Sequence, residues 1–579
     1  MLKKAFQRFS LNKKLIILLL FGVLTWSVTM VKSGIIYPYG MGFWGPNGHD
    51  GVWHIALAQS LARGSFEMPT FAGEGLKNYH IVFDLLLALI NKLTNLPINL
   101  LYFQIIPPIL ALLIGILTYK FVFIWRKSKV QAFWAVFFTY FGGSFGWIVN
   151  LLRNGNLSGE SMFWSQQAIS TLINPPFALS LIFILLGLIF LLKYIKSHTT
   201  YYLVLATFFF GILIEVKAYA GILVLLGLFV ATIWTLLFTT PLRSSVVKVL
   251  IGSVAVSLVL FLFFNRGAQS LIIFQPFWFL ETMMGLTDRI GWIRYFSAMT
   301  TYRMGGMWIK AVPTYLIAFA IFWVGNMGTR LVSSGWWLVS GAGKRKFSDL
   351  SFIDVFIFSM IVAGTLIPMF FLQKGTSWNT IQFFYYSLFF SGILAGVAIG
   401  EFLRESRLKT SILYSIEVGI VLLTIPTTIG TLPHYLPSRP PAMISKEELS
   451  ALNFLSKQPN GTILTHPFDR IKAKEAEPNP PRPLYLYEST AYVSAFSNKP
   501  TFLEDEVNLD ITQYEWKDRK KAVESFLNSL DQTEARAFLK NNNITYIYWL
   551  KGQRAKLGET QLGVEKIFEN SNVDLYKVI

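Results

Sequence analysis

The chain has 579 residues, of which 53% are hydrophobic and only 14% are charged, and this composition excludes an ordinary soluble protein. The formal net charge is +19, but the basic residues gather between long apolar runs, where they orient membrane spans and contact anionic lipid. The bilayer is therefore an expected partner and nucleic acid is not. The sequence has no cysteine, which excludes disulfides, thiolate metal sites and cysteine nucleophiles.

Apolar runs recur along the first three quarters of the chain and predict a polytopic α-helical membrane protein with about eleven spans. The predicted spans are residues 15–31, 100–125, 131–152, 177–192, 201–214, 220–238, 246–264, 313–329, 352–372, 383–400 and 412–432. No small-residue cleavage site follows the first run, so we expect it to remain as an anchor.

Basic residues indicate the orientation of these spans. They precede the first span and recur in every even-numbered connection: Arg126, Lys127 and Lys129; Lys193 and Lys196; Arg243 and Lys248; Lys344, Arg345 and Lys346; Arg404, Arg407 and Lys409. Cytoplasmic loops carry the excess of Lys and Arg, so the N-terminus is predicted to be cytoplasmic. With eleven spans the C-terminal part is then extracytoplasmic. We expect an integral plasma-membrane protein.

The first outward loop, residues 32–99, is the most polar part of the first third of the chain. It contains the run Asn47-Gly48-His49-Asp50-Gly51-Val52-Trp53-His54, and it holds three of the six histidines, His49, His54 and His80. An acid between two histidines is costly to keep beside a bilayer, which indicates a functional site. Residues 50–62 are predicted to form a short interfacial helix, and residues 81–93 a second juxtamembrane helix.

Asp50 is the candidate catalytic acid of this loop. A transfer of a sugar to a hydroxyl group needs a base that takes the acceptor proton, and His54 lies four residues further on, on the same face of a helix. The alternative is that Asp50 caps the interfacial helix, and the two roles are compatible. One hypothesis for His49, Asp50 and His54 is a divalent metal site; the other is hydrogen-bonded histidines without a metal.

Further candidates lie in the other outward segments. Lys217, Arg289, Arg294 and Arg303 are candidates to hold a donor phosphate, because Arg offers bidentate contacts and Lys a point charge. Each can instead extend its cationic group to lipid headgroups. Contacts to the substrates are predicted for His49, His80, Glu215, Trp378, Asn379 and Gln382. Glu215 can pair with Lys217 or act as a second acid, and the last three can instead cap a helix.

The composition changes after the last span. Residues 433–443 are a proline-containing linker, and residues 444–579 are predicted to form a small extracytoplasmic α/β domain. Its predicted helices are 445–457, opened by a capping box, 516–530 and 533–541; its strands are 461–465, 499–503, 544–550 and a pair within 564–578. The domain has no P-loop, dinucleotide fingerprint or nucleophile elbow, which fits a lipid-linked donor.

This order of elements resembles the GT-C superfamily of integral membrane glycosyltransferases, including its mannosyltransferase-like and arabinosyltransferase-like members. The resemblance covers residues 1–432 and is carried by the architecture and by the run from Gly48 to His54. It implies a polyprenyl-phosphate sugar donor, a first-loop acid as the base, matched here by Asp50, and a glycan, lipid or protein acceptor. The usual pair of neighbouring acids is absent, since Gly51 follows Asp50 and the next acid is Glu67.

The alternative function is that of a non-catalytic transporter or scaffold for lipid-linked glycans. A transporter is expected to place polar groups midway through its spans and to contain inverted repeats. The predicted spans contain few charges and the sequence has no internal repeat, so the enzyme hypothesis is preferred.

Overall fold

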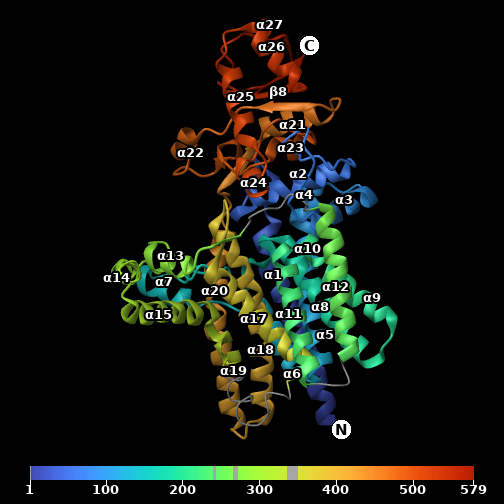
Figure 1. Ribbon diagram of the computed structural model, residues 1–579, viewed down its shortest axis with the longest axis vertical. Coiled ribbons are helices and arrows are strands. Elements are labelled where there is room, and N and C mark those ends of the chain that lie inside the picture. The colour runs from blue at the N-terminus through green and yellow to red at the C-terminus, as the bar shows by residue number, and fades with distance from the viewer. Residues whose placement is uncertain (1, 239–242, 265–271, 335–349) are drawn as a thin grey trace. The chain divides into compact units, whose positions relative to one another are not determined.

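The computed structural model describes residues 2–238, 243–264, 272–334 and 350–579 (Figure 1). The predicted basic cluster at residues 344–346 lies outside them. Contacts divide the chain into two compact units. One unit contains Met1–Thr29, Pro108–Phe263 and Gln269–Pro433, and the other contains Met30–Pro107 and His434–Ile579. The first outward loop, which the sequence analysis grouped with the spans, thus folds together with the C-terminal residues.

Within the described ranges, nine helices are long and apolar enough to cross a membrane. These spans are Asn12–Val31, Ile98–Arg126, Pro175–Ser197, Ala218–Phe238, Arg243–Phe264, Trp308–Ser334, Phe352–Phe370, Ser377–Glu405 and Thr410–His434. They correspond to nine of the eleven predicted spans, and they confirm a polytopic helical membrane protein.

The other two predicted spans have a different form. The run at 131–152 is a pair of helices, α6 (Lys129–Phe141) and α7 (Gly146–Asn154), bent by 43° at a short break. The run at 201–214 is the shorter helix α9 (Thr200–Gly211), followed by one turn, α10 (Leu213–Val216). Hydropathy alone missed both breaks, because apolar residues continue on either side of them.

The remaining helices of the membrane unit are named in Figure 1. They are α1 (Leu2–Val31), α5 (Ile106–Arg126), α8 (Pro175–Ser197), α11 (Ala218–Phe238), α12 (Arg243–Phe264), α13 (Trp278–Gly285), α14 (Ile293–Met304), α15 (Trp308–Met327), α17 (Phe352–Phe370), α18 (Gln382–Glu405), α19 (Thr410–Thr424) and α20 (Pro426–Thr431). Helix α18 is buried along nearly its whole length. Gly396 lets α6 approach it closely, since a Cβ there would lie 2.2 Å from the backbone nitrogen of Ala135.

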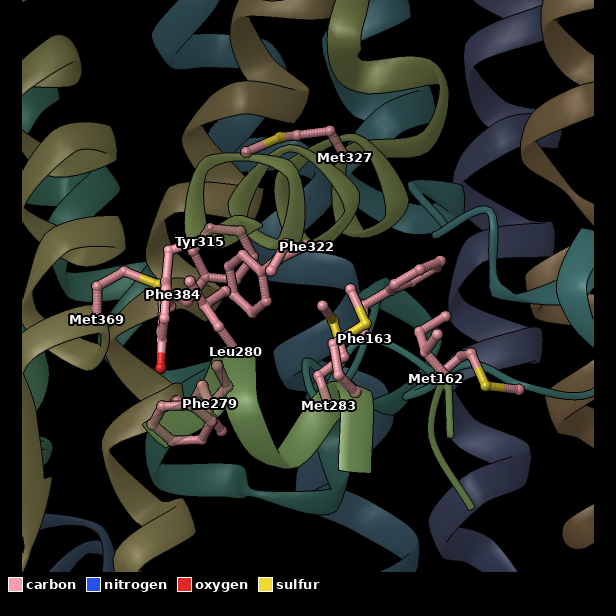
Figure 2. Packing of buried hydrophobic residues seen from close by; sticks show 14 of the residues in the cluster. Met162, Phe163, Phe279, Leu280, Met283, Tyr315, Phe322, Met327, Met369 and Phe384 are labelled. Carbon is pink, nitrogen blue, oxygen red and sulfur yellow. The ribbon is translucent and has the colours of Figure 1, made fainter. Parts of the chain in front are cut away.

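An apolar cluster joins the outward segment around α13 to its neighbours. Figure 2 shows Phe279, Leu280 and Met283 of α13 directed toward Tyr315 and Phe322 of α15. Methionines fill the irregular space between the rings, as flexible thioether side chains do in cores. The described part of the segment after α12 therefore contains two packed helices rather than irregular loop.

In the second unit, one sheet joins the first outward loop to the C-terminal chain. Its strands are β1 (Ile35–Tyr37), β2 (Gly40–Phe43), β5 (Ala442–Ser445) and β7 (Arg482–Pro483), in the order β1-β2-β5-β7. Strands β2 and β5 are antiparallel, with Gly40 opposite Ser445. Gly40 has a φ of +129°, and a Cβ there would lie 2.1 Å from the carbonyl oxygen of Ile444, so only glycine permits this pairing.

The second sheet of this unit confirms the predicted α/β domain. Its strands, in the order β6-β8-β10-β9, are β6 (Thr462–Thr465), β8 (Ile544–Leu550), β9 (Val564–Glu569) and β10 (Val573–Val578). The helices of the C-terminal chain include α21 (Lys446–Ser456), α22 (Arg470–Ala476), α23 (Tyr492–Ser497), α24 (Glu506–Ile511), α25 (Trp516–Asn528) and α26 (Gln532–Asn541). The predicted capping box of Ser445 and Glu448 opens α21.

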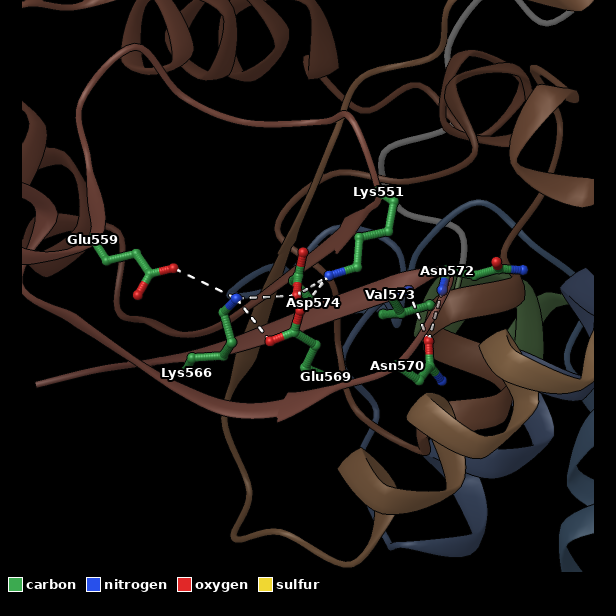
Figure 3. Close-up of polar contacts among 8 residues, drawn as sticks. All are labelled: Lys551, Glu559, Lys566, Glu569, Asn570, Asn572, Val573 and Asp574. Atoms are coloured by element: carbon green, nitrogen blue, oxygen red, sulfur yellow. Dashed lines mark hydrogen bonds and ion pairs between the residues drawn. The ribbon is translucent and has the colours of Figure 1, made fainter.

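Charged side chains connect β9, β10 and the residue that follows β8 in this sheet. Figure 3 shows Lys551 and Lys566 in contact with Glu569 and Asp574, and Lys551 Nζ lies 2.7 Å from a carboxylate oxygen of Glu569. The predicted strand at 499–503 is wrong, because only an isolated bridge forms there, between Thr501 and Ile463.

Candidate functional site

Helix α2 (Asp50–Ala62) presents the candidate acid, and its bounds match the predicted helix. It is buried on nearly all sides. The reason is that α2 packs against α3 (Val82–Thr94) and against α23 of the C-terminal chain. Gly51 also lets α2 approach the segment Leu101–Ile105 closely, since a Cβ there would lie 2.8 Å from the Phe103 ring.

Asp50 is the first residue of α2, and its side chain is 55% exposed. Its Oδ1 lies 2.9 Å from Nδ1 of His49, the residue at the cap position, and no side-chain cap bond forms there. Asp50 is therefore the first helical residue and not the N-cap residue, and the N-terminal turn favours its negative charge. An accessible carboxylate that is held in one orientation at the start of a buried helix can act as a general base.

His54 does not join Asp50. Its Nδ1 lies 2.8 Å from Oδ1 of Asp84 in α3, and the two side chains are 7% and 0% exposed. Burial raises the pKa of Asp84, while the charge of His54 and its hydrogen bond act in the opposite direction. This buried pair ties α2 to α3 beneath the exposed acid.

Aromatic side chains enclose the buried pair. The rings of Tyr79 and Tyr102 lie 6.1 and 5.7 Å from the ring of His54. The ring of His80, a predicted substrate contact, lies 4.4 Å from that of Tyr79 and is tilted by 43° relative to it. Burial, and next the charge of Asp84, raises the pKa of Tyr79 well above its ordinary value, so this phenol stays neutral.

The predicted metal set of His49, Asp50 and His54 does not come together. In the part of the chain that the structure describes, no three His, Asp or Glu side chains are grouped so as to hold a metal ion. His49 and Asp50 together offer one nitrogen and one oxygen, fewer than the three protein ligands of a catalytic zinc site.

Two C-terminal residues that the sequence analysis missed, Asp505 and Arg482, act on the pair of His49 and Asp50. Asp505 is buried in the left-handed region with a φ of 58°, where it accepts hydrogen bonds from Asn508. Burial raises its pKa to about 7; the bonds from Asn508 and the charge of His49 oppose the rise, and the charge of Asp50 adds to it. Arg482 lies 3.5 Å above the ring of Tyr487.

These charges also affect the pKa of His49. Burial lowers its pKa, but the charge of Asp50, the hydrogen bond to Asp50 and the charge of Asp505 together outweigh this, so that the pKa is raised. Arg482 acts against the rise. The ring of His49 lies 6.3 Å from that of Tyr487, so the C-terminal chain provides part of the surroundings of the candidate acid.

The membrane unit holds the other predicted residues. Glu215 and Lys217 lie at the break between α10 and α11, and both are buried. The Lys217 ammonium lies 5.4 Å from the ring of Tyr219, whose hydroxyl donates to Gln373. Burying opposite charges at a helix break is costly unless they interact with other groups, which supports a role beyond packing.

The three predicted arginines differ in their surroundings. Arg303 forms an ion pair with Glu281 at 3.1 Å, and the same carboxylate accepts a hydrogen bond from Tyr315. Arg289 lies 4.4 Å above the Trp164 ring, and it contacts its neighbour Asp288 at 3.5 Å. Arg294 is exposed.

The predicted substrate contacts near the start of α18 are Trp378, Asn379 and Gln382, and they make few strong contacts with one another. Trp378 is exposed, and Gln382 donates a long hydrogen bond of 3.5 Å to Asn379. Their predicted contacts to sugar hydroxyls stay predictions.

Glu160 is a further acid that the sequence analysis did not single out. It lies between α7 and α8, where its carboxylate accepts hydrogen bonds from the backbone N–H of Gln167 at 2.7 Å and from the hydroxyl of Ser170 at 2.9 Å. Burial raises its pKa, and these bonds oppose the rise. An acid held in this way is a second candidate for polar chemistry.

The sequence matches no protein-family model and no curated protein. Solved structures do resemble it. The oligosaccharyltransferase of Archaeoglobus fulgidus, tethered to an acceptor peptide with the NVT sequon, has a TM-score of 0.54 at 12% identity and covers 94% of this chain and 69% of its own. Its apo form has a TM-score of 0.53 at 13% identity, with 94% and 70% covered.

The same archaeal enzyme, AglB, in complex with an inhibitory peptide and a dolichol-phosphate, has a TM-score of 0.50 at 13% identity and covers 94% of this chain and 69% of its own. At such low identity the likeness concerns the fold, and it extends over both units. The chain therefore has a fold similar to that of the archaeal oligosaccharyltransferase.

Proposed function

We propose that this protein is a membrane glycosyltransferase that moves a sugar from a polyprenyl-phosphate donor to an acceptor on the extracytoplasmic side. The observation that carries the proposal is the accessible carboxylate of Asp50, held by His49 at the start of a buried helix. The shared fold supports it, because the archaeal enzyme with that fold is an oligosaccharyltransferase and one of its structures contains a dolichol-phosphate.

Asp50 takes the proton of the acceptor hydroxyl as that oxygen attacks the anomeric carbon of the donor sugar. The bond between this carbon and the phosphate oxygen breaks, and the polyprenyl phosphate leaves with the electron pair. His49 orients the carboxylate through its 2.9 Å contact. The buried pair of His54 and Asp84 keeps α2 in place, so that the carboxylate does not have to reorganise during transfer.

Cationic groups are needed to balance the leaving phosphate. Arg482 is a new candidate, since its charge acts on His49 in the same unit as Asp50. Its Nε–H is buried and donates to no partner among the described residues, which leaves a donor for an anionic ligand. Lys217 and Arg289 remain proposed phosphate contacts. Arg303 is less suited, because Glu281 already offsets its charge.

The proposed topology follows the charge pattern of the loops. The N-terminus lies in the cytoplasm, and Asp50 and the C-terminal domain lie outside, in the plasma membrane of the cell. The acceptor is a glycan, a lipid or a protein that reaches this outer side.

The test uses the full-length protein in liposomes, supplied with polyprenyl-phosphate sugars and with an extracytoplasmic glycan, lipid and protein fraction as acceptors. We expect the wild type to release polyprenyl phosphate and to label one acceptor class. The Asp50→Ala variant should lose transfer while its amount and topology remain unchanged. Full transfer by that variant would remove Asp50 from the mechanism.

A further inference from the structure

The second unit contains a polar cavity that the proposed chemistry does not use. It has a volume of about 160 Å³ and lies where the parallel strands β6 and β8 end. His466 after β6, Leu550 at the end of β8 and Gln553 after β8 are in its lining. Ligands of α/β proteins bind in the crevice at the carboxyl ends of parallel strands. The volume is smaller than the roughly 300 Å³ at which pockets for drug-sized molecules begin, and it suits a unit as small as one sugar ring.

The lining is aromatic and acidic. Four tyrosines, Tyr485, Tyr487, Tyr492 and Tyr548, offer ring faces and hydroxyls. Five carboxylates face the cavity, from Asp469, Glu488, Glu504, Asp505 and Glu506, against two cations, Lys472 and Arg554. Burial raises the pKa of Glu504 to about 8 and that of Asp505 to about 7, so these two acids are not fully charged at neutral pH. The remaining three acids still outnumber the two cations, which disfavours a phosphorylated ligand. The tyrosine rings can contact the apolar face of a sugar, and the tyrosine hydroxyls and acidic side chains can form hydrogen bonds to its hydroxyl groups. This lining fits a neutral carbohydrate.

A buried hydroxyl in the wall also indicates a polar ligand. Thr490 is 6% exposed, and its Oγ1 has no hydrogen-bond partner among the residues that the structure describes. A buried hydroxyl without a partner costs about 1–3 kcal/mol, and a ligand that bonds to it recovers this energy. A peptide bound by strand addition would instead need the edge of a sheet.

The cavity adjoins the candidate catalytic acid within the same unit. Tyr487, in its wall, lies 6.3 Å from the ring of His49. Asp505, also in the wall, interacts through its charge with both His49 and Asp50. A ligand held here is therefore near the base that would take its proton.

A wider cavity of about 950 Å³ lies next to it. Both are lined by residues 466–469, Gln553 and Arg554, so the two spaces share one wall. A single small molecule would not need the wider space, whereas further units of a chain would occupy it.

We propose that this pair of cavities binds the acceptor, and that the acceptor is a neutral oligosaccharide. Its terminal sugar enters the inner cavity beside Asp50, and the following units lie along the outer one. The acceptor role rests on the proposed transferase function; the binding of a neutral glycan does not.

The test measures binding of the full-length protein in lipid nanodiscs to an array of neutral oligosaccharides, the same sugars carrying phosphate, and peptides. Wild type should bind neutral oligosaccharides. Tyr485→Ala, Glu488→Gln and Thr490→Val should each weaken this binding, by at least about tenfold for Tyr485→Ala. Glu475→Gln, an exposed acid outside both cavities, is the matched control and should bind as wild type does.

Selective binding of peptides or of phosphorylated sugars would overturn the proposal. So would the absence of binding to any neutral oligosaccharide, or binding that all three variants leave unchanged while they keep the thermal stability of wild type. The Asp50→Asn variant separates the two proposals, because it should bind oligosaccharide normally and fail to transfer. Normal transfer by Asp50→Asn would contradict the transferase proposal, but it would not contradict the proposed glycan-binding site.

Discussion

Removal of His54 should destabilise the second unit, and the loss should depend on pH. Asp84 is completely buried, and His54 is its partner at 2.8 Å. A His54→Ala substitution leaves an uncompensated buried carboxylate, which costs about 3–5 kcal/mol. In a domain of 150–250 residues each kcal/mol shifts the unfolding midpoint by about 2–4 °C, so the midpoint should fall by roughly 6–20 °C.

The dependence on pH follows from the state of Asp84. Burial raises its pKa in the folded state, and His54 opposes this rise, so the variant should have a still higher pKa there. The folded state then holds the proton more tightly than the unfolded state. Stability therefore falls as pH rises from the pKa of Asp84 in the unfolded state to its higher pKa in the folded state. The penalty of His54→Ala should therefore be largest at neutral pH and should shrink as Asp84 becomes protonated on acidification.

The assay is thermal unfolding of the full-length protein in detergent, followed by tryptophan fluorescence across a series of pH values. Asp84→Asn is the control, since its amide removes the charge and can keep a hydrogen bond to His54, and it should cost less at neutral pH. A loss for His54→Ala that is below about 1 kcal/mol, or that is equal at every pH, would refute the reasoning, because both features follow from one buried charge.

Three further predictions concern the same unit. Gly40→Ala should cost about 1–3 kcal/mol in thermal unfolding, because its Cβ would meet the backbone of β5, while Gly75→Ala, in open space, should cost little; equal effects would contradict the role of the β2–β5 pairing. Asp505, with its pKa raised from 3.8 to about 7, should make stability fall as pH rises through this window, and Asp505→Asn should flatten this fall; parallel curves would exclude the carboxyl as its source. Arg482→Gln should raise the pKa of His49 in histidine-selective NMR, and an unchanged or lower value would show that the guanidinium does not act on the ring.

Local patterns were sufficient to predict several elements. The capping box at Ser445 predicted the start of α21, and the apolar periodicity of residues 81–93 predicted α3 within one residue. Long apolar runs predicted most spans, because a span must satisfy its own backbone hydrogen bonds whatever lies around it. The bend after α6 escaped prediction, since hydropathy does not register a change of direction.

Long-range contacts explain what the sequence analysis missed. The pairing of β2 with β5 joins strands about 400 residues apart, and no local pattern indicates it. His54 was expected beside Asp50, four residues away, but tertiary packing pairs it with Asp84, 30 residues away. A signal for Asp84 was present, because it shares the buried face of α3 with Leu87 and Ala88. Asp505 had no such signal, since it lies between two other acids in a run typical of a solvated surface.

The most direct test of the account is the rate of sugar transfer by Asp50→Asn at saturating polyprenyl-phosphate donor. The substitution keeps the shape of the side chain and removes its ability to take a proton, so we predict a rate at least about 100-fold below that of wild type. Glu74→Gln, which changes an exposed acid of the same loop, should transfer as wild type does. A rate for Asp50→Asn within a few-fold of wild type would contradict the claim that this carboxylate is the catalytic base.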